Sequence, residues 1–159
     1  HKMWTHEGGI STPLIVHWPN GNIGSGKITR QNGHVIDLVP TIMDIVNSSL
    51  PVAVEYPGKS LLGTIRSGKT HRRTLFWEHL GNRAVRRGQW KAVSEYQHAW
   101  QLFDMRTDRG ENIELSEDHP ALLKQLISKW VDWAEASSVV HWETMRGFHP
   151  NYPFEYKRK

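Results

Sequence analysis

The chain has 159 residues, enough for one ordinary domain or for a small domain with part of another. It contains no cysteine, which excludes disulfides and thiolate chemistry within these residues, and 20 Lys and Arg against 16 Asp and Glu give a formal net charge of +4. No apolar run approaches the about 20 residues that cross a bilayer, so we expect no membrane span.

The first part of the chain predicts one strand and one helix. Thr12–Pro19 is an apolar, β-branched run that ends in Trp-Pro, and it predicts a buried strand. Val35–Val46 is apolar on most sides of a helix and has Pro40 in an early position, which predicts a helix buried between layers. We expect part of this helix to be exposed in this chain, where it would make a homo-oligomer possible.

The next stretch, residues 47–70, is rich in proline and glycine. It predicts an irregular connector with one short helical turn around Ser60–Arg66. We place the boundary between two structural units within it, at residues 51–70.

Residues 74–104 predict a small antiparallel sheet. Four short strand-like pieces, 74–79, 83–86, 90–96 and 100–104, are separated by short turns, which makes them neighbours in a meander. A turn at 108–112 follows. An apolar stripe with Pro120 in its first turn then predicts a long helix over 119–136, which would lie across one face of the sheet. From His141 onward we expect an extended tail, and the fold class is α+β.

The sequence lacks the patterns that are typical of several functional classes. The ten histidines are scattered without metal-ligand spacing, so no metal site is expected. No Gly-x-Ser-x-Gly turn marks a serine nucleophile. Arg72 and Arg73 precede Phe76 and Trp77, but strand alternation puts these aromatic residues in the core, and no nucleic acid partner is expected. A non-enzymatic module that binds an anionic polymer through the arginine-rich sheet stays open as an alternative.

The most informative stretch begins at Lys2. The lysine is followed by four residues, Glu7-Gly8-Gly9, three residues, Pro13 and then an apolar run that ends in Trp-Pro. This arrangement resembles the segment of the sulfatase family that follows its metal-binding residues, and it is most similar to bacterial arylsulfatases. Further motifs resemble the family in the same order: Asp37-Leu-Val-Pro-Thr41, Gly58-Lys-Ser-Leu61, Leu75-Phe-Trp-Glu-His79, Trp90-Lys91, Leu102-Phe-Asp104 and Asp108-x-x-Glu-Asn112.

The resemblance implies an organisation for a longer protein. Residues 1–50 would be the end of the α/β catalytic domain, which in this family resembles alkaline phosphatase. Residues 51–70 would be the connector, and residues 71–159 would form the small C-terminal domain, with the sheet, the long helix and the tail. An N-terminal catalytic part would be missing from this chain.

The resemblance also implies an activity. The full-length parent would be a sulfuric ester hydrolase of the arylsulfatase type, with a sulfate ester as substrate. Its formylglycine nucleophile and its Ca²⁺ ligands would lie upstream of His1, so this chain alone would be inactive. We expect the parent to be periplasmic or secreted, because sulfatases of this type usually act outside the cytoplasm.

The resemblance assigns roles to three residues in particular. Lys2 would contact the sulfate, where an ammonium group stabilises the negative charge that develops as the ester is cleaved. His79 and Asn82 follow the first strand of the sheet, in a loop that in sulfatases tends to reach the mouth of the cleft, so they would touch substrate unless they only build a hairpin turn. We expect Glu7 to be structural or orienting, and Lys91 to be structural, snorkelling along the sheet.

Overall fold

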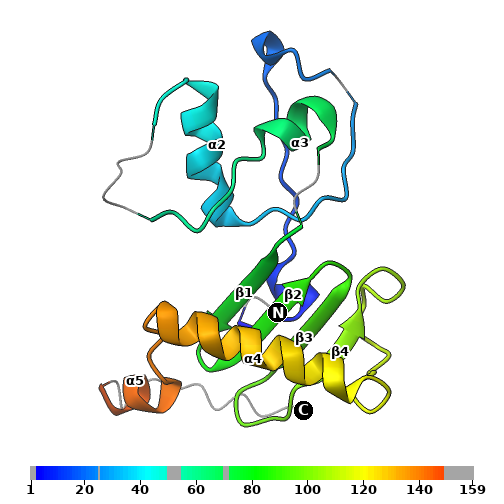
Figure 1. Cartoon of the computed structure of the whole chain (residues 1–159), viewed down its shortest axis with the longest axis vertical. Helices are drawn as coiled ribbons and strands as arrows, with labels where there is room; N and C mark the ends of the chain where they lie inside the picture. Colours follow the sequence, from blue (N-terminus) through cyan, green and yellow to red (C-terminus); the bar gives the residue numbers. More distant parts are fainter. Residues whose placement is uncertain (1–2, 25, 50–54, 70–71, 149–159) are drawn as a thin grey trace. The chain divides into compact units, whose positions relative to one another are not determined.

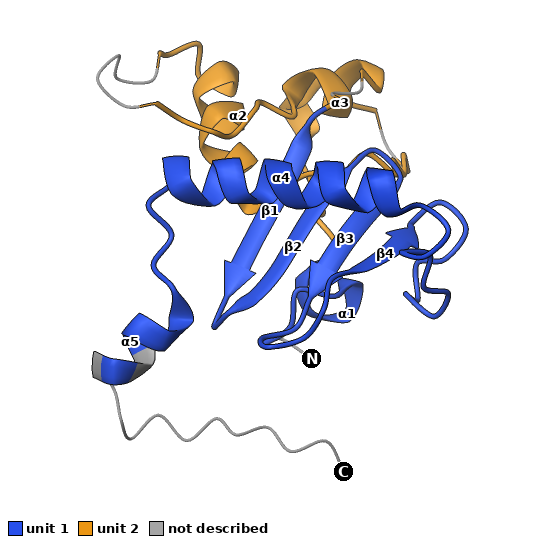
Figure 2. Cartoon of the chain, turned by 60° about the horizontal axis from the view of Figure 1, so that its bottom comes forward, with its two compact units in different colours: residues 1–12, 73–159 blue, residues 13–72 orange. Residues whose placement is uncertain are grey.

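The computed structural model describes residues 3–24, 26–49, 55–69 and 72–148 (Figure 1). The chain forms two compact units (Figure 2). Unit 1 combines residues 1–12 with residues 73–159, and unit 2 consists of residues 13–72. Within the described part of the chain, no helix is both long and apolar enough to cross a membrane.

Unit 1 is built on a four-stranded antiparallel sheet. Its strands are β1 (Thr74–His79), β2 (Asn82–Arg87), β3 (Trp90–Ser94) and β4 (Gln101–Asp104), and they are paired in the order β1-β2-β3-β4. Each strand therefore pairs with its neighbours in the sequence, as short connections require. The predicted meander and the α+β class are confirmed.

The hairpin between β1 and β2 turns one residue earlier than the sequence predicts. Leu80 and Gly81 both have positive φ, 55° and 82°. Positive φ at both central residues is typical of a type I′ turn, whose twist matches that of the flanking strands. The predicted strand 83–86 therefore begins one residue too late, because Asn82 begins β2 and pairs with His79.

A long helix, α4 (Pro120–Ala136), lies across one face of the sheet (Figures 1 and 2). Its apolar stripe covers the side chains that strand alternation directs toward it. The buried residues of this core are Val85, Ala92, Leu102, Leu126 and Trp130. The Trp130 Nε1 donates a hydrogen bond to the carbonyl of Trp77 at 3.0 Å, so this indole is buried without an unsatisfied donor. The predicted packing of α4 is confirmed.

The end of the chain contains a second helix where we expect an extended tail. α5 spans Trp142–Phe148 and has Glu143 in its first turn, where an acidic side chain favours a helix. The two prolines of this region, Pro150 and Pro153, come only after it. The prediction of an extended tail is therefore wrong for residues 142–148.

Unit 2 contains short helices joined by irregular chain. α2 (Leu38–Ile45) follows a 3-10 turn, η2 (Val35–Asp37), and α3 spans Leu62–Ser67. Both predicted helical segments are thus present. α2 leaves much of its apolar surface exposed, with Ile42 at 56%. Partial exposure is confirmed, and burial between two layers is wrong.

The predicted strand over Thr12–Pro19 is also wrong. The segment has no regular structure until a 3-10 turn, η1 (Pro19–Gly21), and Ile15 is 87% exposed. A strand is stable only when a neighbour satisfies its backbone N–H and C=O groups. No strand occurs among the described residues of unit 2, so this segment has no ladder to join there.

Buried polar side chains link separate backbone segments of unit 2. The Asp37 carboxylate accepts hydrogen bonds from the backbone N–H groups of His34 at 2.7 Å and Lys59 at 2.9 Å. The Thr41 hydroxyl donates to the carbonyl of Asp37 at 2.6 Å and accepts from the N–H of Leu61 at 2.8 Å. The two sequence motifs at 37–41 and 58–61 are therefore partners of each other.

Candidate functional site

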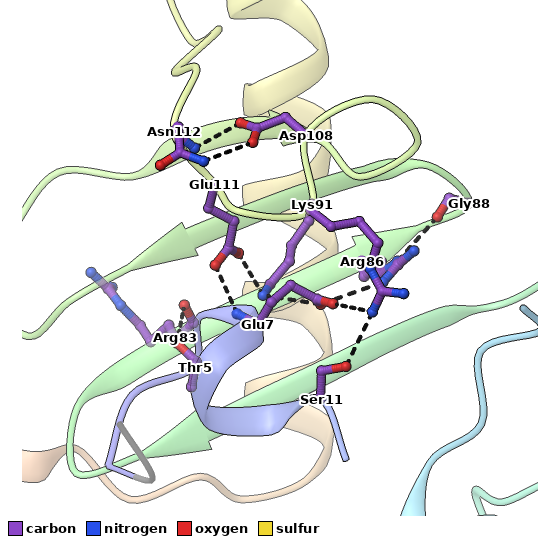
Figure 3. A network of polar contacts seen from close by, with 11 residues as sticks. Thr5, Glu7, Ser11, Arg83, Arg86, Gly88, Lys91, Asp108, Glu111 and Asn112 are labelled. Atoms are coloured by element: carbon purple, nitrogen blue, oxygen red, sulfur yellow. Dashed lines mark hydrogen bonds and ion pairs between the residues drawn. The ribbon is translucent and has the colours of Figure 1, made fainter. Parts of the chain in front are cut away.

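The segment that carries the Glu7-Gly8-Gly9 motif lies on the face of the sheet opposite α4 (Figure 3). It forms one short helix, α1 (Glu7–Ile10). Side chains alternate between the two faces of a strand. Val85 and Ala92 point to α4, so Arg86 and Lys91 point to the α1 side.

Five charged side chains meet between α1 and the sheet, and we call them the α1 charge network (Figure 3). The Lys91 Nζ lies 2.7 Å from the Glu111 Oε1 and 3.5 Å from the Glu7 Oε1. The Arg86 Nη1 lies 3.4 Å from the same Glu7 oxygen. The Arg109 Nη2 donates to the other Glu7 oxygen at 2.9 Å. Glu7 thus contacts three cations.

The register of the sheet explains why two carboxylates are needed. Arg86 and Lys91 are directly paired across β2 and β3. Like charges in such a pair repel each other, and the Lys91 side chain has no exposed surface that would allow water to screen it. Glu7 and Glu111 supply the opposite charges. Because one comes from α1 and the other from the turn after β4, the network joins three separate parts of the chain.

Burial and charge shift two pKa values within the network. Burial lowers the pKa of the Lys91 ammonium, and Glu111 and Glu7 counteract part of this shift. Burial raises the pKa of the Glu7 carboxyl, but the combined effect of Lys91, Arg109 and Arg86 is larger, so the pKa lies below its ordinary value of 4.5. Glu7 is therefore an ionised partner of the cations, which leaves no proton for general acid catalysis.

Further hydrogen bonds fix the segment at alternate residues. The Asn82 Nδ2 donates to the carbonyl of Met3 at 3.0 Å. The Thr5 Oγ1 donates to the carbonyl of Arg83 at 3.1 Å, and Thr5 is buried. The backbone N–H of Glu7 donates to the Glu111 Oε2 at 2.7 Å. Residues 3, 5 and 7 are thus each bound to the sheet or to the turn that follows it.

The predicted site residues lie in different settings. Lys2 is outside the described residues, and its role stays a prediction. His79 is exposed at the end of β1. Asn82 is half-buried, and its Nδ2 donates to the carbonyls of both Met3 and His79, while its Oδ1 accepts from the N–H of Tyr96 at 3.0 Å. Contact of His79 and Asn82 with substrate also stays a prediction.

Sequence reasoning missed how Lys91, Glu111 and Arg109 work together. We expect Lys91 to snorkel, but its side chain is completely buried, so this expectation is wrong. Glu111 and Arg109 both belong to the turn motif at 108–112. The turn motif is visible in the sequence. Its contacts with Glu7, however, span about a hundred residues, and no local pattern encodes them.

The described residues do not fit a calcium site. Nowhere in the part of the chain that the structure describes do three His, Asp or Glu side chains gather where they could hold a metal ion. Glu7 and Glu111, the two carboxylates of the α1 charge network, are paired with cations.

Comparison with known proteins gives the chain a family. Residues 1–135 match the family model described as N-sulphoglucosamine sulphohydrolase, C-terminal. An uncharacterized sulfatase of Schizosaccharomyces pombe is 31% identical, in an alignment over 87% of this chain and 27% of that protein. N-acetylgalactosamine-6-sulfatase of Mus musculus is 33% identical over 70% of this chain and 22% of that enzyme. The chain thus spans about a quarter of these relatives' length.

Solved structures share the fold. The crystal structure of Ps i-CgsB has a TM-score of 0.68 at 23% sequence identity, over 83% of this chain and 31% of that one. The same protein in complex with k-i-k-neocarrahexaose gives 0.65 at 23% identity, over 74% of this chain and 27% of that one. The sequence and fold comparisons agree, and the chain belongs to the sulfatase family, as a C-terminal portion.

Proposed function

We propose that the full-length protein hydrolyses sulfate esters and that this chain supplies Lys2 to the site. The match of residues 1–135 to the C-terminal region of a sulfatase carries the proposal, because it includes Lys2 and the Glu7-Gly8-Gly9 motif. Sulfatases generally use formylglycine and calcium, and in this proposal other residues of the full-length protein supply both.

The role of Lys2 follows from the charge of the reaction. Cleavage of a sulfate ester develops negative charge on the bridging oxygen while the sulfate oxygens must be held in place. An ammonium group in a site that excludes water stabilises this charge without reorganisation. Lys2 would bind and orient the sulfate, and α1 with its charge network would hold the adjoining segment against the sheet.

A sulfated carbohydrate is the substrate class that we propose. The matching family model and the mouse relative are both named for amino sugars. His79 is exposed beside the β1–β2 turn and could contact the sugar. A panel that compares 4-nitrophenyl sulfate with sulfated amino sugars tests this: preference for the aryl sulfate would contradict it.

Binding of an anionic polymer by the sheet is the weaker alternative. Arg86 contacts Glu7, and Arg83 donates to the Ser94 Oγ at 2.9 Å and lies 4.9 Å from the centre of the Trp100 ring. Both guanidinium groups therefore have partners within unit 1, and neither is presented as a free cation to a polymer.

Removal of the lysine tests the proposed function. In the full-length enzyme, Lys2→Ala should lower kcat by about 10²–10³, because one charge-stabilising donor is lost. KM should change less. Lys124→Ala is the matched control, since Lys124 is exposed on α4. An unchanged kcat in Lys2→Ala would leave the family membership intact and remove the catalytic role.

A further inference from the structure

The residues next to Lys2 in the sequence are bound to the sheet more extensively than a short surface helix requires. Their anchors are the Asn82 side chain on Met3, the Thr5 hydroxyl on the sheet, and the α1 charge network on Glu7. Arg109 adds a contact at the end of α1, where its Nη2 donates to the Ser11 Oγ at 3.2 Å. The segment is therefore fixed along its whole described length.

The first anchor acts on Met3, the residue that follows Lys2 in the sequence. Consecutive Cα atoms are separated by about 3.8 Å, so fixing the backbone at Met3 limits where Lys2 can begin. The Asn82 amide reaches Met3 because its other contacts, with His79 and Tyr96, hold it at the start of β2. The sheet therefore supplies a reference point one residue away from Lys2.

Holding α1 in place with buried charges costs desolvation free energy that apolar contacts would not. Burying a lysine removes its hydration, and apolar residues of similar volume are often as stable as a buried ion pair or more so. Glu111 also has a positive φ of 54°, a conformation that glycine adopts more easily. A contribution to stability alone therefore explains neither the buried Lys91 nor Glu111 at its positive φ. Charged groups do specify one arrangement, because any shift of α1 would move Glu7 away from its three cationic partners.

We propose that Asn82, Lys91 and Glu111 are positioning residues for Lys2. The small sheet fixes the Met3–Ser11 segment, and through it the backbone next to the lysine that stabilises the sulfate. The inference rests on the proposed function, because it assigns a purpose to the anchors only if Lys2 acts in catalysis. It gives the C-terminal domain a part in the reaction that acts through the backbone next to Lys2, separately from any contact of Asn82 with substrate.

A double-mutant cycle in the full-length enzyme tests the proposal. Asn82→Asp retains an acceptor for the N–H of Tyr96 but removes the donor to Met3. We expect kcat to fall by up to about 10²-fold, as for a catalytic group displaced by about 1 Å, with a smaller change in KM. In a Lys2→Ala background the same substitution should have almost no effect on kcat, because the group that it positions is absent.

Two further variants separate positioning from folding. Lys91→Met with Glu111→Leu removes a cation and an anion together and preserves the volume of the core. Its unfolding midpoint should stay within a few degrees of that of the parent enzyme. It should lower kcat when Lys2 is present, but not in the Lys2→Ala variant. Lys124→Ala, at an exposed position of α4, is the control, because Lys124 lies on a different element from Glu111 and Met3.

The possible outcomes are distinct. If Lys2→Ala leaves kcat unchanged, the proposed role of Lys2 fails and the inference fails with it. If Lys2→Ala lowers kcat but Asn82→Asp and the Lys91/Glu111 double variant do not, the function stands and the positioning role is overturned. If both variants lower kcat equally with and without Lys2, the sheet acts independently of the lysine, which also overturns it.

Discussion

The two units of this chain hold their structures by different means. Unit 1 encloses an apolar core in which Val85, Leu102 and Leu126 are at most 1% exposed. In unit 2, Ile42 and Val46 are more than half exposed, while the side chains of Asp37 and Thr41 are buried and hydrogen-bonded to the backbone. Apolar packing therefore specifies unit 1, whereas a few polar links specify unit 2.

The largest expected difference concerns truncation of apolar side chains. Trp130→Ala should lower the free energy of unfolding by about 3–5 kcal/mol, because it empties the centre of the core of unit 1. Ile42→Ala, at an exposed position of α2, should change it by less than about 0.5 kcal/mol. Urea unfolding followed by circular dichroism measures both. Equal losses would show that the two units are stabilised alike.

A glycine pair tests the polar links of unit 2. A Cβ on Gly58 would lie 2.0 Å from the carbonyl oxygen of Ile36, so Gly58→Ala should cost about 1–3 kcal/mol by overpacking. A Cβ on Gly63, in α3, would meet only the Lys69 side chain at 3.6 Å, and Gly63→Ala should be neutral or stabilising. Hydrogen exchange of the Leu61 amide reports on unit 2 directly, and faster exchange in the Gly63 variant would contradict this reading.

Acid should weaken the α1 charge network in unit 1. Because the pKa of Glu7 is lowered in the folded chain, the stability that its ionisation contributes is fully present above its ordinary value of 4.5. That contribution is lost as the pH falls through the lower pKa of the folded state. Lys91, Arg86, Arg109 and Glu111 face Glu7 and set this range. Glu7→Gln should therefore lose less stability than the parent chain over acidic pH.

The difference between the Glu7→Gln variant and the parent chain is the quantity to follow, because Asp108 and Glu114 also have lowered pKa values and titrate in both. Thermal unfolding midpoints between pH 7 and pH 2 give the two curves. Parallel curves would mean that Glu7 contributes nothing to acid sensitivity.

The smallest effect on stability concerns the exposed face of α2. At high concentration we expect copies of the chain to associate through Val39, Ile42 and Val46. Ile42→Lys should abolish this association while the free energy of unfolding changes by less than about 0.5 kcal/mol. Sedimentation velocity across a range of concentrations distinguishes the two chains, and a monomeric parent chain at every concentration would rule the association out.

The sequence predicts the elements of unit 1 better than those of unit 2 for a physical reason. The β1–β4 strands pair with their neighbours, so alternation and turn residues suffice to locate them. Thr12–Pro19 has equally good strand character, but a strand needs a partner, and local pattern does not reveal whether one exists. Only the contrast between the exposed Ile15 and the paired Val85 shows this.

The candidate site shows the same limit. The Glu7-Gly8-Gly9 motif, Lys91 and Glu111 are each recognisable in the sequence, and the family resemblance places them in order. Their meeting depends on the register of β2 with β3, which puts Lys91 opposite Arg86, and on a turn that presents Glu111 with positive φ. Composition and periodicity predict neither the β2–β3 register nor the conformation of this turn.

The discontinuity of unit 1 has a consequence for synthesis on the ribosome. The Glu7 amide meets a carboxylate 104 residues further along the chain, so the Met3–Ser11 segment cannot take its place until the turn after β4 has emerged. Closing so long a loop is slow compared with forming the local hairpins. The segment that follows Lys2 is thus made well before the residues that fix it. A chain that stops before Glu111 would never secure it, however well its remaining elements fold.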